Sequence, residues 1–469
     1  MKRMKKFPLY LYPLLLAAFP VLFLYSVNME EVGIADVPLP LSILVVGTLV
    51  FMGLVRWLVK DWHKIALITT LFLILLFLYV PFRSLFQFLT IAGSTYKTVL
   101  WGCFWLLPYI IPTVLILRSR RDFSVGTKFL SITATALLIV SLISMGVHQI
   151  GTFGPATQET GAGLIHGEVL PDVYYIILDE YVRDDALEEI YGYDNELTNY
   201  LVSKGFYVAS ESQSAYWMSV PSMASSLNMD YIDESEYNYG EKLKMLQNNK
   251  VSQLLKSMGY HYIFVTSGAL EAGIDRYAEL RLPQQYVFGM KISKFAIYVV
   301  QATMLCPFTL GFAGHDWRDG ILYCFDEIAK VPNIEAPTFT FAHIVCPHTP
   351  FVFDRDGNPI GPITKLPLEE HREKYLDQLI FLNKKIEVLV EEILSSSDVP
   401  PIIILQGDHG LRHHNEDKKW RHAILNAYHL PDGGTQSLYP TICPVNSFRV
   451  IFNYYFGADY ELLEDKIIS

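Results

Sequence analysis

Five long apolar segments without a charged residue occupy the first 150 residues, and they limit what this chain can fold into. They run over residues 7–27, 39–55, 65–82, 98–117 and 129–147. A helix of about 20 residues crosses a hydrocarbon core of about 30 Å. None of the segments shows the polar face that a helix of a soluble core repeats every 3.6 residues. The sequence therefore predicts an all-α transmembrane domain of five helices over residues 1–147.

Basic residues mark alternate ends of these segments. Lys and Arg gather at residues 2–6, 56–64 and 118–128, whereas the first connection carries Glu30, Glu31 and Asp36. By the positive-inside rule, the N-terminus is cytoplasmic. Five crossings then carry the rest of the chain to the extracellular or periplasmic side of the cell membrane, as a multi-pass protein.

Two alternatives concern the same region. The basic start of the first segment is typical of a cleaved signal peptide, but no small-residue cleavage site follows and four more segments do. A transporter is disfavoured because the centres of the segments contain no Asp, Glu, Lys or Arg.

The charge balance divides the chain into two environments. Residues 1–150 contain 13 Lys and Arg against 5 Asp and Glu, whereas residues 151–469 contain 24 against 43. With 51% hydrophobic residues and 5 cysteines, the chain is neither disordered nor a disulfide scaffold. Its acidic second part excludes a basic nucleic-acid-binding surface, so no nucleic-acid partner is expected.

A glycine-rich linker over residues 148–170 precedes a domain over residues 171–469. Short apolar runs there alternate with helical patterns, which is typical of an α/β domain with a mostly parallel sheet covered on both faces. Helices are expected over 194–203 and 375–394. Strands are expected over 173–178, 262–265, 338–345, 402–406 and 448–452.

Polar residues follow three of the expected strands. Asp179 and Glu180 follow the first, His348 follows the third, and Asp408 and His409 follow the fourth. Ligand sites of parallel α/β folds gather at the carboxyl ends of strands. Alone, each Asp could cap a helix and each His could lie in a turn. Together, two carboxylates and an imidazole predict one divalent metal, and calcium, magnesium, manganese and zinc all remain open.

A serine near the start of an expected helix could act as a nucleophile. In the segment Ser219-Val220-Pro221-Ser222, Pro221 suits the first helical position and places Ser219 near the cap. There a hydroxyl faces free backbone N–H groups, and a metal would lower its pKa. The alternative is a serine that only caps the helix.

These motifs, in this order, resemble those of the sulfatase and alkaline phosphatase superfamily. The similar parts are Pro171-Asp172-Val173 running into Asp179, the Ser219 turn, Gly407-Asp408-His409-Gly410, and Cys346-Pro347-His348-Thr349-Pro350. The resemblance covers about residues 170–455. A membrane domain followed by such a domain is also similar to the layout of lipoteichoic acid synthase and of phosphoethanolamine transferases.

The resemblance implies an alkaline-phosphatase-like fold and a role for each matching residue. Asp179, Asp408 and His409 would bind the metal together with the nucleophile Ser219, with Glu180 as a weaker fourth ligand. His348 would contact the anionic substrate or protonate the leaving group. The implied reaction is phosphoryl transfer or phosphodiester hydrolysis. Its partners would be a membrane lipid or lipid-linked donor and a cell-envelope glycan or lipid acceptor.

Two departures from the family pattern bear on the substrate class and on the number of metal ions. Met223 stands where sulfatases that form formylglycine carry Arg, which favours an unmodified serine and phosphate esters over sulfate esters. The residues after Asp377 lack the His of a second metal site, so one metal is expected. A sulfatase acting on sulfated glycans and a non-catalytic scaffold that binds envelope polymer remain the alternatives.

Basic and aromatic residues close to these motifs could bind the substrate. A cluster follows the Gly-Asp-His-Gly motif, and Arg in it could hold phosphate oxygens in a bidentate manner. Trp217 could line the same cleft or simply pack. The cluster consists of Arg412, His413, His414, Arg421 and His422. Arg421, His422 and Trp217 are the expected substrate-binding members, beside His348.

Overall fold

The chain forms two compact units in the computed structural model. It describes residues 9–29, 32–85, 95–152, 170–233, 235–267, 277–282, 286–287, 290–291, 294–305, 317–412 and 415–468. One unit comprises Met1–Ala156 with Gln285–Gly314, and the other comprises Thr157–Gln284 with His315–Ser469. We call them the membrane unit and, for the activity proposed below, the catalytic unit. Most of the predicted linker lies outside the described residues, and the predicted domain boundaries remain a prediction.

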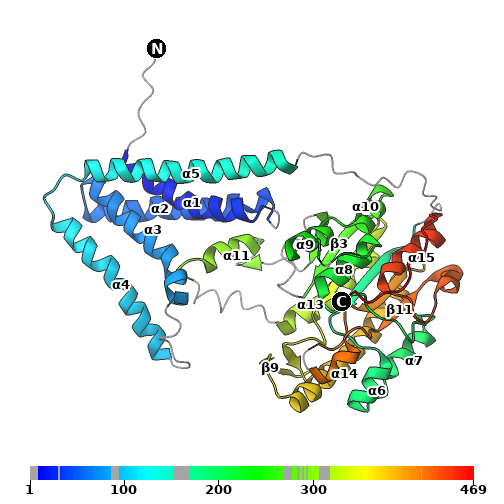
Figure 1. The fold of residues 1–469 in the computed structure, drawn as a ribbon. Coiled ribbons are helices and arrows are strands. Elements are labelled where there is room, and N and C mark those ends of the chain that lie inside the picture. Colours follow the sequence, from blue (N-terminus) through cyan, green and yellow to red (C-terminus); the bar gives the residue numbers. More distant parts are fainter. Residues whose placement is uncertain are drawn as a thin grey trace. The chain divides into compact units, whose positions relative to one another are not determined.

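The membrane unit is helical and contains one helix for each predicted apolar segment (Figure 1). The helices are α1 (Tyr12–Val27), α2 (Pro38–Leu58), α3 (Trp62–Leu85), α4 (Thr95–Arg118) and α5 (Ser124–Thr152). In the part that the structure describes, Ile34–Leu58, Trp62–Phe82 and Ser124–Val147 are long and apolar enough to cross a membrane. Tyr12–Val27 and Trp105–Arg118 are shorter. The chain is thus a membrane protein, whereas five crossings and their orientation remain predictions.

The catalytic unit is built on a mixed sheet with the strand order β2-β11-β10-β1-β7-β3-β4. Its strands β10, β1, β7, β3 and β4 are parallel, and β11 runs antiparallel to both β10 and β2. The bounds are β1 (Val173–Leu178), β2 (Tyr207–Val208), β3 (His261–Thr266), β4 (Leu280–Leu282), β7 (Thr338–Ile344), β10 (Ile402–Gly407) and β11 (Asn426–His429).

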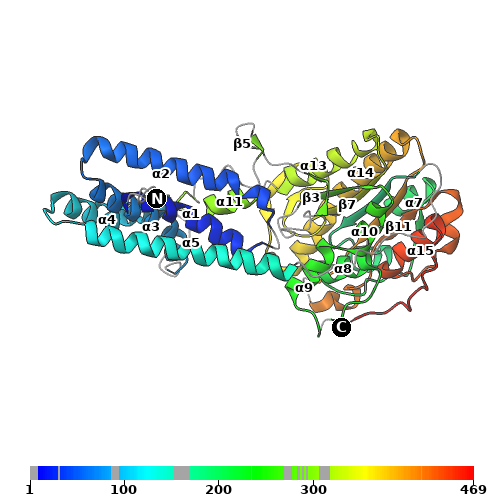
Figure 2. The same ribbon diagram turned by 90° about the horizontal axis from the view of Figure 1, so that it is seen from above.

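Helices cover both faces of this sheet, as Figure 2 shows from above. Alternate residues of β1 enter different cores because side chains alternate along a strand. Val173, Tyr175 and Ile177 face the core with α8 (Ser219–Asn228), α9 (Tyr239–Gln247), α10 (Lys250–Ser257) and α15 (Pro444–Phe456). Tyr174, Ile176 and Leu178 face the core with α6 (Asp184–Tyr191), α7 (Glu196–Ser203), α13 (Trp317–Ile328) and α14 (Leu368–Ser396). The predicted fold class is therefore confirmed.

Shorter elements complete the described residues. Two hairpins pair β5 (Tyr286–Val287) with β6 (Met290–Lys291) and β8 (Phe351–Phe353) with β9 (Pro359–Ile363). The remaining helix of the membrane unit is α11 (Lys294–Gln301). Short 3-10 turns lie at Leu9–Leu11, Ile34–Asp36, Val331–Asn333, Asn415–Trp420 and Pro431–Ser437.

Four of the five predicted strands are present, and the fifth prediction was wrong. Residues 448–452 lie inside the helix α15. Pro444 stands in its first turn, and Gly457 ends it with a φ of 64°. These are typical start and stop signals, and they override the strand preference of the apolar run Phe-Arg-Val-Ile-Phe. The run is apolar because most of this helix is buried under the sheet.

A matched pair on α14 tests the packing of this fold. Leu389 is 1% exposed in the core, whereas its neighbour Val388 is 52% exposed. We predict that Leu389→Ala lowers the free energy of unfolding by about 2–5 kcal/mol, since it leaves a cavity. Val388→Ala should change it by less than about 0.5 kcal/mol. Thermal unfolding of the full chain in detergent measures both, and equal effects would contradict the assignment of the buried face.

Candidate active site

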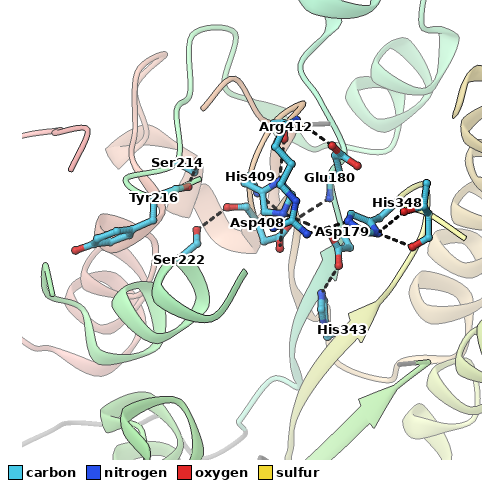
Figure 3. A network of polar contacts seen from close by, with 12 residues as sticks. Asp179, Glu180, Ser214, Tyr216, Ser222, His343, His348, Asp408, His409 and Arg412 are labelled. Atoms are coloured by element: carbon cyan, nitrogen blue, oxygen red, sulfur yellow. Dashed lines mark hydrogen bonds and ion pairs between the residues drawn. The ribbon is translucent and has the colours of Figure 1, made fainter. Parts of the chain in front are cut away.

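The site lies at the carboxyl ends of the two adjacent parallel strands β1 and β10. Leu178 pairs with Gly407 in the register of these strands, so the next residues, Asp179 and Asp408, emerge side by side. His409 follows Asp408 directly. Figure 3 shows the three side chains converging on one point. All three are at most 1% exposed.

Three ligand atoms meet there. His409 Nε2 lies 3.6 Å from Asp179 Oδ1 and 3.6 Å from Asp408 Oδ2. Among the described residues, these three atoms are buried and have no hydrogen-bond partner. Buried polar atoms are costly unless they are paired or bind a metal. The donor set of two carboxylate oxygens and one imidazole nitrogen fits a divalent ion.

The surrounding imidazoles keep Asp179 ionised. Burial by itself raises the pKa of this carboxyl group, but His348, His343 and His409 outweigh burial and hold the pKa well below its usual range. A carboxylate that is charged in the folded protein is ready to bind a cation.

His343 on β7 is a site residue that the sequence analysis missed. Its Nε2 lies 3.4 Å from Asp179 Oδ2. Asp179, His343 and Asp408 each offer a ligand atom within 4.8 Å of the others' ligand atoms. The signal in the sequence was a histidine inside the otherwise apolar strand Thr-Phe-Thr-Phe-Ala-His-Ile. His343 therefore either joins the metal or holds the second oxygen of Asp179.

Backbone groups orient Asp408. Its Oδ1 accepts hydrogen bonds from Glu180 N–H at 3.0 Å and from His409 N–H at 2.9 Å. These bonds use one carboxylate oxygen and leave Oδ2 directed at the site. Glu180 Oε1 accepts from Arg412 N–H at 3.0 Å, so the suggested weaker ligand has at least one oxygen engaged elsewhere. Its role as a ligand remains a prediction.

Two glycines are required where the Asp408 loop is crowded. A Cβ on Gly407 would lie 2.3 Å from the carbonyl oxygen of Tyr181, and one on Gly410 would lie 1.8 Å from that of Trp420. Only glycine lets these backbones approach so closely. The Gly-Asp-His-Gly motif thus reflects packing around the site as well as its chemistry.

Ser219 is the first residue of α8 and is half-buried. The helix begins two residues earlier than expected, because Met218 is the cap and Pro221 is the third residue. A proline in the first turn costs no intrahelical hydrogen bond. In the same turn, Ser222 Oγ donates to the carbonyl oxygen of Asp408 at 2.5 Å. This bond joins the N-terminus of α8 to the loop that carries two of the proposed ligands.

His348 lies against the same loop. The backbone N–H of His348 donates to the carbonyl oxygen of Asp179 at 3.1 Å. The centre of the His348 ring lies 6.4 Å from the centre of the His409 ring. Arg412 donates to His348 Nε2 at 2.9 Å. Burial lowers the pKa of His348, but the carboxylates of Asp179 and Glu180 outweigh burial and raise it. A guanidinium and an imidazole therefore lie together beside the proposed metal, which suits an anionic substrate.

The other predicted substrate-binding residues form a second group. Arg421 stacks over the ring of Trp217 at 5.2 Å, and Trp217 is 37% exposed. His422 Nδ1–H donates to the carbonyl oxygen of Ser214 at 2.9 Å, and burial lowers its pKa. Gly410 N–H donates to the carbonyl oxygen of Arg421 at 2.7 Å, which ties this group to the metal loop. His413 and His414 lie outside the described residues.

Comparison with solved structures finds distant similarities. No protein-family model and no curated protein matches the sequence. The periplasmic domain of EcEptC from Escherichia coli, solved with zinc, is 13% identical with a TM-score of 0.43, over 62% of this chain and 85% of that chain. Lipooligosaccharide phosphoethanolamine transferase A from Neisseria meningitidis is 12% identical with a TM-score of 0.39, over 92% and 89%. A putative sulfatase, yidJ from Bacteroides fragilis, is 14% identical with a TM-score of 0.38, over 62% and 76%.

Removing a proposed ligand should empty the metal site. We predict that the purified full chain contains one divalent ion and that Asp179→Asn loses it, since a neutral amide is a poor ligand. Elemental analysis by mass spectrometry measures this content. The exposed Asp356 provides the control Asp356→Asn, which should keep the metal. Unchanged metal in Asp179→Asn would contradict the assignment.

A tyrosine on α14 tests how the ligand loop is held. Glu180 has a φ of 64°, and its carbonyl oxygen accepts from the Tyr375 hydroxyl at 2.7 Å. We predict that Tyr375→Phe weakens metal binding about 10–100-fold, as expected for a lost outer-shell contact. Tyr200→Phe removes a similar bond to the carbonyl oxygen of Glu387 and should leave metal affinity unchanged. Competition with a chelator measures both affinities, and equal values would refute the role of Tyr375.

Proposed function

We propose that this membrane protein is a metal-dependent phosphoryl-group transferase or phosphodiesterase with Ser219 as its nucleophile. One observation supports this most strongly. The unpartnered atoms of Asp179, Asp408 and His409 converge beside a loop that is hydrogen-bonded to the first turn of the helix beginning at Ser219. A nucleophile at a helix N-terminus next to a cation site is suited to anionic esters.

Each residue of the site has its own role in the proposed reaction. Ser219 gives its hydroxyl proton to solvent, its Oγ attacks phosphorus, the bond to the leaving oxygen breaks, and a phosphoserine forms. The first N–H groups of α8 face the anionic oxygens, since no carbonyl of their own helix accepts from them. Arg412 leaves His348 Nε2 to hold an anionic oxygen of the substrate, and His348, whose raised pKa favours the protonated ring, donates the Nε2 proton to the leaving oxygen. Attack by an alcohol or by water on the phosphoserine then restores Ser219. A divalent ion, when bound, stabilises the alkoxide and the developing negative charge.

The membrane unit favours a substrate at the lipid surface. The described residues include three helices that are long and apolar enough to cross a membrane, and these helices precede the catalytic unit. We therefore propose a membrane lipid or lipid-linked donor and a cell-envelope glycan or lipid acceptor, on the extracellular or periplasmic side.

The packing of Met223 argues against a sulfatase. Its side chain is 1% exposed and belongs to the apolar core between α8 and the sheet. It occupies the position at which formylglycine-forming sulfatases carry Arg, so this core offers no cation to a modified residue 219. An unmodified serine and phosphate esters are therefore the better proposal.

Two serines on α8 provide the test. We predict that Ser219→Ala lowers the hydrolysis of bis(p-nitrophenyl) phosphate by the full chain at least about a hundredfold, because the nucleophile is lost. Ser225 Oγ is buried and has no hydrogen-bond partner in the described part of the chain, so Ser225→Ala serves as the matched control and should stay active. Full turnover by Ser219→Ala would refute the proposal.

The chemical state of residue 219 and the ester preference form a second test. We expect the peptide that contains Ser219 to have the mass of unmodified or phosphorylated serine. Loss of two hydrogens from Ser219, together with faster hydrolysis of p-nitrophenyl sulfate than of the phosphodiester, would support the sulfatase instead. No turnover of either ester and no bound metal would support the scaffold.

A further inference from the structure

A segment that follows β3 and β4 of the catalytic unit in sequence belongs to the membrane unit in space. Residues 285–314 group with residues 1–156, although catalytic-unit sequence flanks them on both sides. The chain therefore passes between the two units three times, after residues 156, 284 and 314. The described part of this segment is centred on α11, which lies beside α1 in Figures 1 and 2.

The inner face of α11 packs into an apolar cluster of the membrane unit. Phe295 and Val299 are 4% and 2% exposed. Their cluster includes residues from the end of α1, the loop after it and the start of α2, namely Val21, Tyr25, Met29, Val32 and Val37. The rings of Phe295 and Tyr25 are in edge contact, with centroids 6.4 Å apart. By contrast, Tyr298 on the other face of α11 is 42% exposed.

The backbone after α11 continues against α3. Met304 N–H donates to the carbonyl oxygen of Leu76 at 2.7 Å, in the C-terminal half of α3. The neighbouring N–H groups also have acceptors: Ala302 donates to Tyr298, Thr303 to Val300, and Leu305 to the Thr303 hydroxyl. Non-helical backbone at membrane depth is tolerated only where its polar groups are satisfied inside the protein. The N–H groups of these four residues meet that requirement.

All of these contacts lie at one end of the helical bundle. The cluster takes the C-terminal half of α1, the start of α2 and, through Met145, the last part of α5. The chain leaves the bundle for the catalytic unit at this same end of α5. The contact is therefore on the side of the membrane to which the catalytic unit is delivered, whichever side that is.

We propose that residues 294–305 are a second membrane anchor of the catalytic unit, held by the bundle of α1, α2 and α3. The linker after α5 is then only one of the attachments. The anchor keeps the catalytic unit attached to the bundle even when that linker is cut. Its occupant is this chain's own segment, and its recognition is apolar packing together with one backbone hydrogen bond.

A protease site in the linker tests the anchor without reference to activity. Residues 157–163 are replaced by a protease recognition sequence in the full chain, and membranes are cut and washed in high salt. We expect the fragment that contains the catalytic unit to stay with the membranes. The variant Phe295→Ser/Val299→Ser should release at least about tenfold more of it, because two buried apolar side chains are lost. The exposed-face control Tyr298→Ser should behave like the parent.

The outcomes separate cleanly. Release of the parent fragment on cutting overturns the proposal, and so does retention of the double variant, since another surface would then hold the unit.

A crosslink keeps the test decisive should the double variant fail to accumulate. The 2.7 Å hydrogen bond from Met304 N–H to the carbonyl oxygen of Leu76 brings these two residues next to each other. With Cys103 and Cys306 replaced by serine, Leu76→Cys/Met304→Cys should join the two cut fragments through a short crosslinker with two thiol-reactive groups, whereas neither single cysteine should. Absence of that product overturns the anchor.

Discussion

Two carboxyl groups buried side by side are the constraint on which the catalytic unit depends. Asp179 and Asp408 leave adjacent strands at the same level, and both are removed from water. Oxygen atoms of the two carboxyl groups lie within 4.8 Å of each other. Two ionised carboxylates at that separation repel strongly in a medium of low dielectric constant. Two sets of groups reduce this repulsion. His343, His348 and His409 surround Asp179, while backbone N–H groups bind one oxygen of Asp408. The atoms that remain unpartnered are those that a cation would neutralise.

The residues around the site hold the loops that carry these two carboxyl groups. The two glycines of the Gly-Asp-His-Gly motif let the loop pass against the carbonyl oxygens of Tyr181 and Trp420. The hydroxyl of Tyr375 binds the carbonyl oxygen of Glu180, whose φ is positive. Ser222 ties α8 to the carbonyl oxygen of Asp408. These contacts fix two short loops at the ends of two strands. Contacts of this kind, behind the ligands, orient a metal site.

The membrane sets the other constraint. Apolar helices form one part of the chain, and α11, whose sequence lies between two parts of the catalytic unit, packs against them. A site that acts on lipid-linked esters gains from such attachment, because a tethered unit meets its substrate at a high effective concentration. The anchor and the reaction are nevertheless independent claims, since packing in the bundle does not require the chemistry at Ser219.

The sequence by itself determined the features that depend on local patterns. Runs of apolar residues revealed the membrane helices and four of the central strands, and the polar residues directly after those strands identified Asp179, Asp408 and His409. Local pattern misled at residues 448–452, where Pro444 and Gly457 define a buried helix whose composition resembles a strand. Tertiary structure alone decided three further matters. Strand order places His343 against Asp179, a loop brings Arg412 to His348, and a segment more than 200 residues away in sequence packs against α1. Such contacts join residues far apart in the chain, and no local periodicity encodes them, because they arise only when separate elements pack together.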